Sequence, residues 1–189
     1  MKNTKIAAAL AALLLAAGYS PARAERLLSD EKAIGEMLPG SETVEKVSRP
    51  VTAPELEALK GKLNGSLQVD GKGADPKELV FYFGMKGGKK TGVAMLDTQP
   101  GKWGIVGYAI GLDLATGKIA NMAVTTLSEK RGRPIVLKSF LKQFFGKGIA
   151  DAFVVGKDVN AVSGATVSSK ASAFAARKAS VVYSSLYLK

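Results

Sequence analysis

The sequence predicts a single α+β domain in which a twisted antiparallel sheet is flanked by helices and followed by a long C-terminal helix. Two observations favour this class. Four β-rich segments lie in succession between residues 79 and 127, separated by turns that contain Gly or Pro, as in an antiparallel meander. Segments with helical periodicity precede and follow this run instead of alternating with it. The 189 residues show no internal repeat and no interdomain linker, so we expect one hydrophobic core.

The first 24 residues have the layout of a secretory signal peptide. Lys2 and Lys5 form a basic region, residues 6–17 are apolar, and a small-x-small site ends at Ala24. The apolar run is shorter than the roughly 18–20 residues that span a bilayer, and no cysteine follows it for lipid attachment. We expect an exported periplasmic or extracytoplasmic protein cleaved after Ala24, with an uncleaved anchor as the alternative.

The elements before the sheet core are expected in residues 25–77. They are a helix over 25–38 that stops at Pro39-Gly40, an alternating edge strand over 43–51, a helix over 53–63 capped by Thr52, and a loop over 71–75. This segment belongs to the same domain and precedes its core, over residues 78–189.

The sheet of the core is expected from strands over residues 79–84, 91–97, 103–114 and 118–127, with a hairpin turn at 115–117. The third of these strands contains Gly104, Gly107 and Gly111. Glycines within a strand indicate bulges or close approach of another group, and a strongly twisted strand explains them equally well.

The C-terminal part is expected to be mainly helical. Its elements are a polar loop over 127–135, an amphipathic helix over 135–148 that buries Phe140, Phe144 and Phe145 and ends near Gly146, a short strand over 153–156, and a helix from Ala165 to about Tyr187 with one apolar face.

Composition excludes several kinds of chemistry. The chain has neither cysteine nor histidine, so it cannot form a disulfide, a Cys/His zinc site, a Cys-ligated iron–sulfur cluster or a c-type haem attachment. Ser-His-Asp and Cys-His nucleophilic arrangements are excluded for the same reason. A redox role would need a cofactor that uses neither residue, and a flavin meets that requirement.

The net charge is +11, and removal of the three leader cations lowers it to +8. The cations are dispersed, which argues against a nucleic-acid partner, and export argues against it more strongly. A basic surface would suit a membrane face or acidic proteins, although a solvated surface is the simpler explanation. We expect a monomer.

The tetrapeptide Ser163-Gly164-Ala165-Thr166 stands where a strand-like segment turns into the C-terminal helix. Glycine permits a tight turn and close approach of a ligand, and the free N–H groups of a helix start favour a phosphate. Ser168 and Ser169 add two more hydroxyls. An ordinary N-cap by Ser163 or Thr166 needs no ligand, so the residues alone leave both interpretations open.

The chain also resembles the FMN-binding domain family, which includes the C subunit of the sodium-translocating NADH:quinone oxidoreductase and the G subunit of the Rnf complex. Three segments carry this resemblance in the family's order, and together they extend it over residues 78–187. They are GKWGIVGYAIGLDLATGKIANMAV, FLKQFFGKG and the stretch Asn160-Ala161-Val162-Ser163-Gly164-Ala165-Thr166. The last resembles the family's Asp-x-x-Ser/Thr-Gly-Ala-Thr pattern, with Asn160 in place of the aspartate.

The resemblance implies a covalent cofactor. In this family a flavin transferase uses FAD to place FMN on the threonine through a phosphoester bond, and Thr166 is the matching residue here. Ser163, Gly164 and Ala165 would then form the turn that the transferase recognises and that lies beside the phosphate. Asn160 has the shape of the family's aspartate without its charge, so flavinylation could be slower or absent.

The resemblance also places two residues near the flavin ring. Glu129 and Gly132 correspond to a family loop near the isoalloxazine ring, although a charged surface loop would look the same. Trp103 and Tyr108 could stack on the ring or belong to the core or an edge strand. Ser168 and Ser169 could hydrogen-bond the phosphate or ribityl chain, or be exposed serines of the first helical turn.

The function expected from these features is an exported electron carrier. It would pass electrons between a membrane-associated donor, such as a membrane electron-transfer complex, and an extracytoplasmic acceptor. It lacks an evident substrate pocket or nicotinamide fingerprint, so a self-contained enzyme is less well supported. Two alternatives stay open: a non-redox binding module that keeps the fold without flavin, and a small flavin reductase that binds FMN reversibly.

Overall fold

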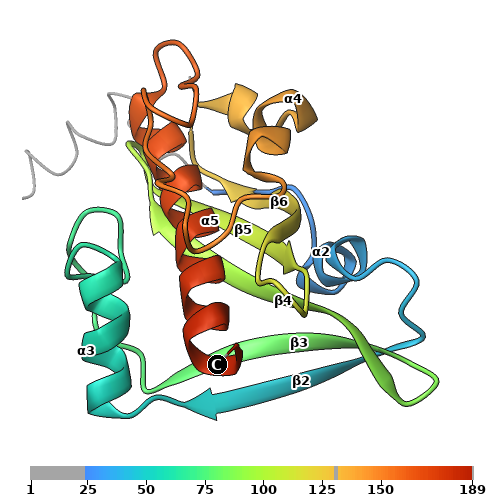
Figure 1. Cartoon of the computed structure of the whole chain (residues 1–189). Helices are drawn as coiled ribbons and strands as arrows, with labels where there is room; N and C mark the ends of the chain where they lie inside the picture. Colours follow the sequence, from blue (N-terminus) through green and yellow to red (C-terminus); the bar gives the residue numbers. More distant parts are fainter. Residues whose placement is uncertain (1–23, 130–131, 189) are drawn as a thin grey trace, which may run out of the picture.

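The structure is a computed structural model that describes residues 24–129 and 132–188. Within these residues the chain forms one antiparallel sheet of six strands in the order β1-β6-β5-β4-β3-β2 (Figure 1). The strands are β1 (Glu25–Arg26), β2 (Thr43–Pro50), β3 (Glu78–Lys86), β4 (Lys89–Pro100), β5 (Ile105–Leu112) and β6 (Ile119–Leu127). The predicted α+β class is confirmed, with the four core strands as a meander and the 43–51 strand at an edge.

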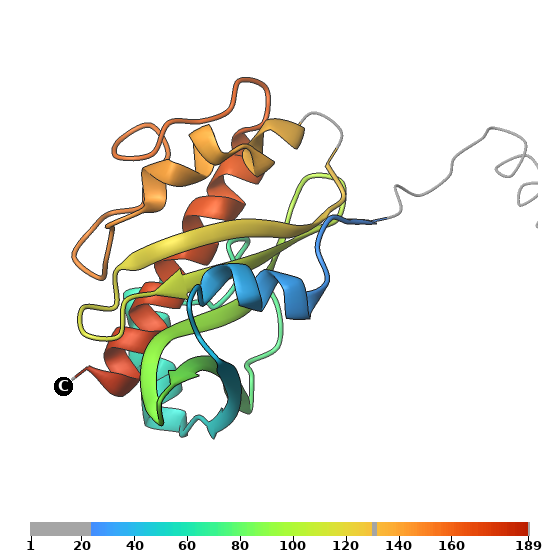
Figure 2. The same cartoon turned by 90° about the vertical axis from the view of Figure 1, so that its right-hand side faces the viewer.

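Helices cover both faces of this sheet. They are α2 (Asp30–Met37), α3 (Ala53–Lys62), α4 (Lys138–Leu141) and α5 (Thr166–Tyr187), with 3-10 turns η1 (Arg133–Val136) and η2 (Lys142–Phe144). α2 lies across one face and α5 across the other, as the two views show (Figures 1 and 2). The main core lies under α5, where buried side chains of all four central strands meet α3, α5 and the α4 region. No helix in the described part of the chain is long and apolar enough to cross a membrane.

Three predicted elements differ from the structure. The helix expected over 25–38 begins only at Asp30, because Glu25 and Arg26 pair with β6 and the Ser29 side chain caps the helix by accepting from the Lys32 N–H. The helix expected over 135–148 is divided into η1, α4 and η2. The strand expected over 153–156 is reduced to a single bridge between Val155 and Val159.

The predicted helix over 53–63 is confirmed together with its cap. Thr52 accepts from the Glu55 N–H while Glu55 accepts from the Thr52 N–H, so the two residues form a capping box. Pro54 stands in the first turn, where its missing N–H costs nothing. Leu59 and Leu63 then pack into the main core beside α5.

The glycines of β5 mark bulges. The register between β5 and β6 shifts after Gly107 and again after Gly111. A Cβ on Gly111 would lie 2.8 Å from the Met37 carbonyl oxygen, and one on Gly107 would lie 2.7 Å from Thr125 Oγ1. The interpretation of these glycines as marks of bulges and of close approach is therefore confirmed for Gly107 and Gly111 without appeal to strand twist, and the close packing of α2 on the sheet depends on Gly111.

Candidate functional site

A cavity of about 440 Å³ opens at the N-terminal end of α5. Three parts of the chain that are distant in sequence form its wall: the turn between β4 and β5, the segment after β6, and the turn that starts α5. The lining residues are Lys102, Trp103, Glu129, Gly132, Gly164, Ala165, Thr166, Val167 and Ser168. The structure thus brings together most of the residues that the sequence suggested for a flavin site.

The start of α5 carries no side-chain cap. Ala165 occupies the N-cap position and no side chain there accepts a hydrogen bond from the helix, so the interpretation of Ser163 or Thr166 as an ordinary N-cap is wrong. The N–H groups of Thr166, Val167 and Ser168 have no protein partner within the described residues. Uncapped N–H groups and the helix dipole favour an anion at this position.

The Ser169 hydroxyl holds the turn before α5 through two hydrogen bonds. Its hydroxyl donates to the Ala165 carbonyl oxygen at 3.0 Å and accepts from the Val162 N–H at 3.0 Å. Gly164, at φ +71°, supplies the left-handed residue that the turn needs. Ser168 and Ser169 are both buried, so the alternative of exposed first-turn serines is wrong. Ser169 does not line the cavity, whereas Ser168 does.

Glu129 links the β4–β5 turn to the start of α5 through two hydrogen bonds. Its side chain is buried, one carboxylate oxygen accepts the Trp103 N–H at 3.0 Å, and the other accepts the Ser168 hydroxyl at 2.9 Å. Gly132 packs against this arrangement, since a Cβ there would lie 2.5 Å from Ser168 Oγ. A residue without a side chain is therefore required at this point of the wall.

The two candidate aromatic residues lie in different places. Trp103 is half exposed and lines the cavity, with the Lys102 ammonium 5.4 Å from its ring centroid. Tyr108 is fully buried and shares a hydrogen bond of 3.1 Å with the Ser172 hydroxyl. Burial raises the pKa of its phenol well above the usual range. Tyr108 is thus a core residue, and only Trp103 of this pair is positioned to meet a ligand in the cavity.

Asn160 and Ser163 are exposed and do not line the cavity. The side chain of Gln143 holds the backbone of Asn160 from both sides: Gln143 Oε1 accepts the Asn160 N–H at 2.7 Å, and Gln143 Nε2 donates to the Asn160 carbonyl oxygen at 3.3 Å. Gln143 was not selected from the sequence as a site residue. The signal that points to it in the sequence is its place in FLKQFFGKG, one of the segments that resemble the family.

Asp158 fixes the loop that leads to this turn. Burial opposes ionisation of its carboxylate, but the Val154 N–H, the Lys147 ammonium and the Phe153 N–H outweigh that effect and lower its pKa to about 2. The corresponding contacts are 2.6, 3.0 and 3.0 Å long. With its carboxylate oxygens engaged in this way, Asp158 has a structural role in the loop.

Asp158→Asn is expected to lower the free energy of unfolding at pH 7 by about 1–2 kcal/mol, allowing for the partial exposure of the carboxylate. Because the folded-state pKa is depressed from 3.8 to about 2, the contribution is present above the unfolded pKa and is lost as the pH falls through this interval. Urea unfolding of both proteins at a series of pH values checks this. Asp70→Asn, at an exposed position, should run parallel to wild type; a pH-independent gap for Asp158→Asn would contradict the prediction.

The fold and the cavity together define a class of protein: a small α+β domain in which a long helix presents an uncapped start and an exposed threonine to a ligand cavity. Residues 101–180 match the model of the family described as FMN-binding domain. This range runs from the β4–β5 turn into the last turns of α5 and includes every residue that lines the cavity. The segment belongs to the FMN-binding domain family. A comparison with curated proteins gave no match.

Proposed function

We propose that this protein is an exported electron-transfer flavoprotein that carries FMN covalently through a phosphoester on Thr166. One observation carries the proposal: the exposed Thr166 stands at the uncapped start of α5, on the wall of a cavity within the FMN-binding domain. Export rests on the leader-like residues 1–24 of the sequence, of which residues 1–23 lie outside the described part of the chain.

The residues around the cavity fit the parts of FMN. The N–H groups of Thr166, Val167 and Ser168 suit a phosphate, and the Lys102 ammonium adds positive charge beside the cavity. The Trp103 ring offers a flat surface for a planar aromatic system. Bound FMN would supply reversible electron acceptance, while the chain would hold it, set its potential and leave part of it accessible to redox partners.

Attachment needs a partner enzyme. The cavity lining contains the Thr166 hydroxyl but no histidine, and both oxygens of its Glu129 carboxylate already accept hydrogen bonds from Trp103 and Ser168. A flavin transferase would therefore supply the base that activates Thr166. The threonine oxygen would form a bond to the phosphorus of the FMN half of FAD. The pyrophosphate bond would break, AMP would leave, and the threonine proton would pass to the base of the transferase. Electrons would then come from a membrane-associated donor and go to an extracytoplasmic acceptor.

The test is the intact mass of the mature protein produced with and without a flavin transferase. A mass increase equal to FMN less one water, seen only with the transferase, supports the proposal. FMN that stays in the supernatant after acid precipitation would instead support a reversible flavin reductase. No flavin from a transferase that modifies a control substrate would overturn the covalent assignment. Asn160→Asp, measured in parallel, shows whether the missing charge limits the reaction.

A further inference from the structure

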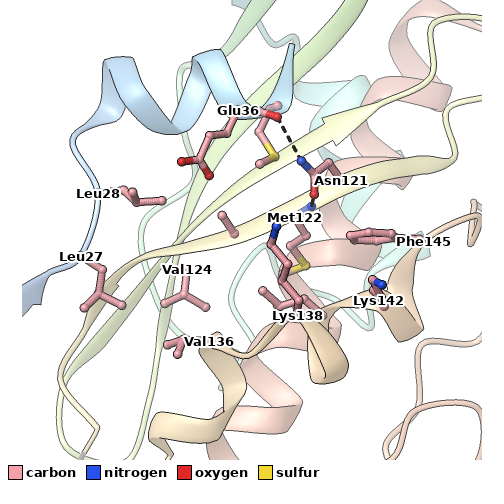
Figure 3. A pocket seen from close by; sticks show the side chains of 13 residues that line it. Leu27, Leu28, Glu36, Asn121, Met122, Val124, Val136, Lys138, Lys142 and Phe145 are labelled. Atoms are coloured by element: carbon pink, nitrogen blue, oxygen red, sulfur yellow. Dashed lines mark hydrogen bonds between the residues drawn. The ribbon is translucent and has the colours of Figure 1, made fainter. Parts of the chain in front are cut away.

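A second and larger hollow lies away from the FMN site, along the outer edge of β6 (Figure 3). Its volume is about 690 Å³. α2 borders it on one face of the sheet, and η1, α4 and η2 border it on the other. Its lining includes the apolar side chains of Leu27, Leu28, Met37, Met122, Val124, Val136, Leu141 and Phe145. We call this hollow, which β6 residues 121–124 line at the sheet edge, the β6 groove.

The edge of β6 is covered only at its two ends. At one end Ile119 exchanges backbone hydrogen bonds with Gly146 and Lys147, each 2.8 Å long. At the other end β1 pairs with the last residues of β6, and the Leu27 N–H donates to the Thr125 carbonyl oxygen. Between these ends, over residues 120–124, β6 has a neighbouring strand on the β5 side alone within the described residues. The open stretch is about 16 Å long at roughly 3.3 Å per residue.

The two edges of the sheet differ in how well their sequences protect them against pairing with another strand. The opposite edge strand, β2, carries Glu45, Lys46 and Arg49 and ends at Pro50. Charges and a terminal proline are the usual means of preventing another strand from pairing with an edge. β6, with the sequence IANMAVTTL, has no charged residue and no proline. The β6 edge therefore lacks the charges and the proline that protect β2, and apolar side chains flank it on both faces. The Asn121 side chain occupies part of this stretch, because Asn121 Oδ1 accepts from the Met122 N–H at 2.9 Å and Asn121 Nδ2 donates to the Glu36 carbonyl oxygen at 3.0 Å (Figure 3). An added strand that bonds the Met122 N–H would displace the first of these contacts.

Charged side chains beside the groove indicate which kind of segment could bind in it. Lys138 and Lys142 are exposed on the α4 side of β6, and neither ammonium lies within 4.0 Å of a carboxylate among the described residues. Glu36 lies on the α2 side. Antiparallel pairing with a second copy would bring α2 against α2 and α4 against α4, and so place like charges together, which is unfavourable. An added strand with acidic side chains toward α4 and apolar side chains toward α2 fits both faces, because successive side chains alternate.

We propose that the β6 groove receives an extended acidic segment of a partner protein, which pairs with β6 as an additional strand. The backbone edge of residues 120–124 supplies the hydrogen bonds, and Lys138 and Lys142 supply the preference for acidic side chains. This surface is separate from the cavity at Thr166, since the two share no lining residue. Binding therefore does not depend on the flavin, and Thr166→Ala leaves it unchanged.

The probe is a fluorescent peptide of four Glu-Val repeats, titrated into the mature protein and followed by anisotropy. Amide hydrogen exchange of residues 120–124 is measured in the complex. We expect binding with protection of these amides, no binding of the matched Lys-Val peptide, and loss of binding when alternate peptide nitrogens are methylated. Lys138→Glu with Lys142→Glu should weaken binding at least tenfold. Lys86→Glu with Lys89→Glu makes the same charge change in the exposed β3–β4 turn and should leave binding nearly unchanged.

Several results would overturn the proposal. An equal loss of peptide affinity in both double variants would show that the acidic peptide responds only to the overall positive charge of the protein. Binding without protection of residues 120–124, or retained after methylation, would exclude strand pairing. Dimerisation of the protein with protection of the same amides would assign the groove to a second copy. Binding to anionic vesicles that depends on Lys138 and Lys142, in the absence of peptide binding, would assign it to a membrane.

Discussion

Thr166→Ala is expected to abolish covalent FMN completely while leaving the folded protein intact. The side chain is exposed and makes no hydrogen bond to another described residue, so its removal should change the free energy of unfolding by no more than about 0.5 kcal/mol. Without the hydroxyl there is no oxygen to form the phosphoester. Intact mass after co-expression with a transferase, together with urea unfolding, measures both effects.

Two further substitutions separate the chemistry from the fold. Thr166→Ser keeps a hydroxyl at the same place and should retain part of the adduct. Thr43→Ala removes an exposed threonine from β2, at the far edge of the sheet, and should leave the adduct at its wild-type level. A full adduct on Thr166→Ala would contradict the assignment, and peptide mapping would then identify the modified residue.

Gly132→Ala is expected to damage the proposed FMN site and to lower the stability of the domain. The new Cβ would lie 2.5 Å from Ser168 Oγ and 2.9 Å from Glu129 Cβ, so it would separate the two residues whose hydrogen bond joins the wall of the cavity to α5. Overpacking of this kind typically costs about 1–3 kcal/mol. We expect a loss of that size in the free energy of unfolding and FMN loading reduced at least tenfold, measured by urea unfolding and by the yield of adduct at a fixed reaction time.

A matched control adds the same methyl group where space is available. Gly61 lies in α3, and a Cβ built there meets no atom within 4 Å. Gly61→Ala should therefore leave FMN loading unchanged and raise the free energy of unfolding by about 0.5–1 kcal/mol, because alanine is the better helix former. Equal behaviour of the two variants would show that the packing around Gly132 does not control the site.

Much of the site was predictable because its residues belong to local patterns. The Ser163–Thr166 turn follows from a glycine with hydroxyl neighbours before a helical period, and the matching segments in family order identified Glu129 and Gly132. The errors arose where long-range contacts outweighed local preference. The apolar residues of the 25–38 segment have helical spacing, yet Glu25 and Arg26 at its start pair with β6 as a strand. The 153–156 segment is β-rich, yet hydrogen bonds to Asp158 fold it into a tight loop.

The sequence by itself determined the α+β class, the exclusion of cysteine and histidine chemistry, and the threonine at the start of the last helix. Only the tertiary structure decided which hydroxyl groups at the start of α5 remain free to contact a ligand. Ser169 turns inward to hold the loop, Ser168 is bound by Glu129 from 39 residues away, and Thr166 stays exposed. The physical reason is that periodicity and turn chemistry act between neighbours along the chain, whereas each hydroxyl's hydrogen-bond partner is set by which distant segments pack against it.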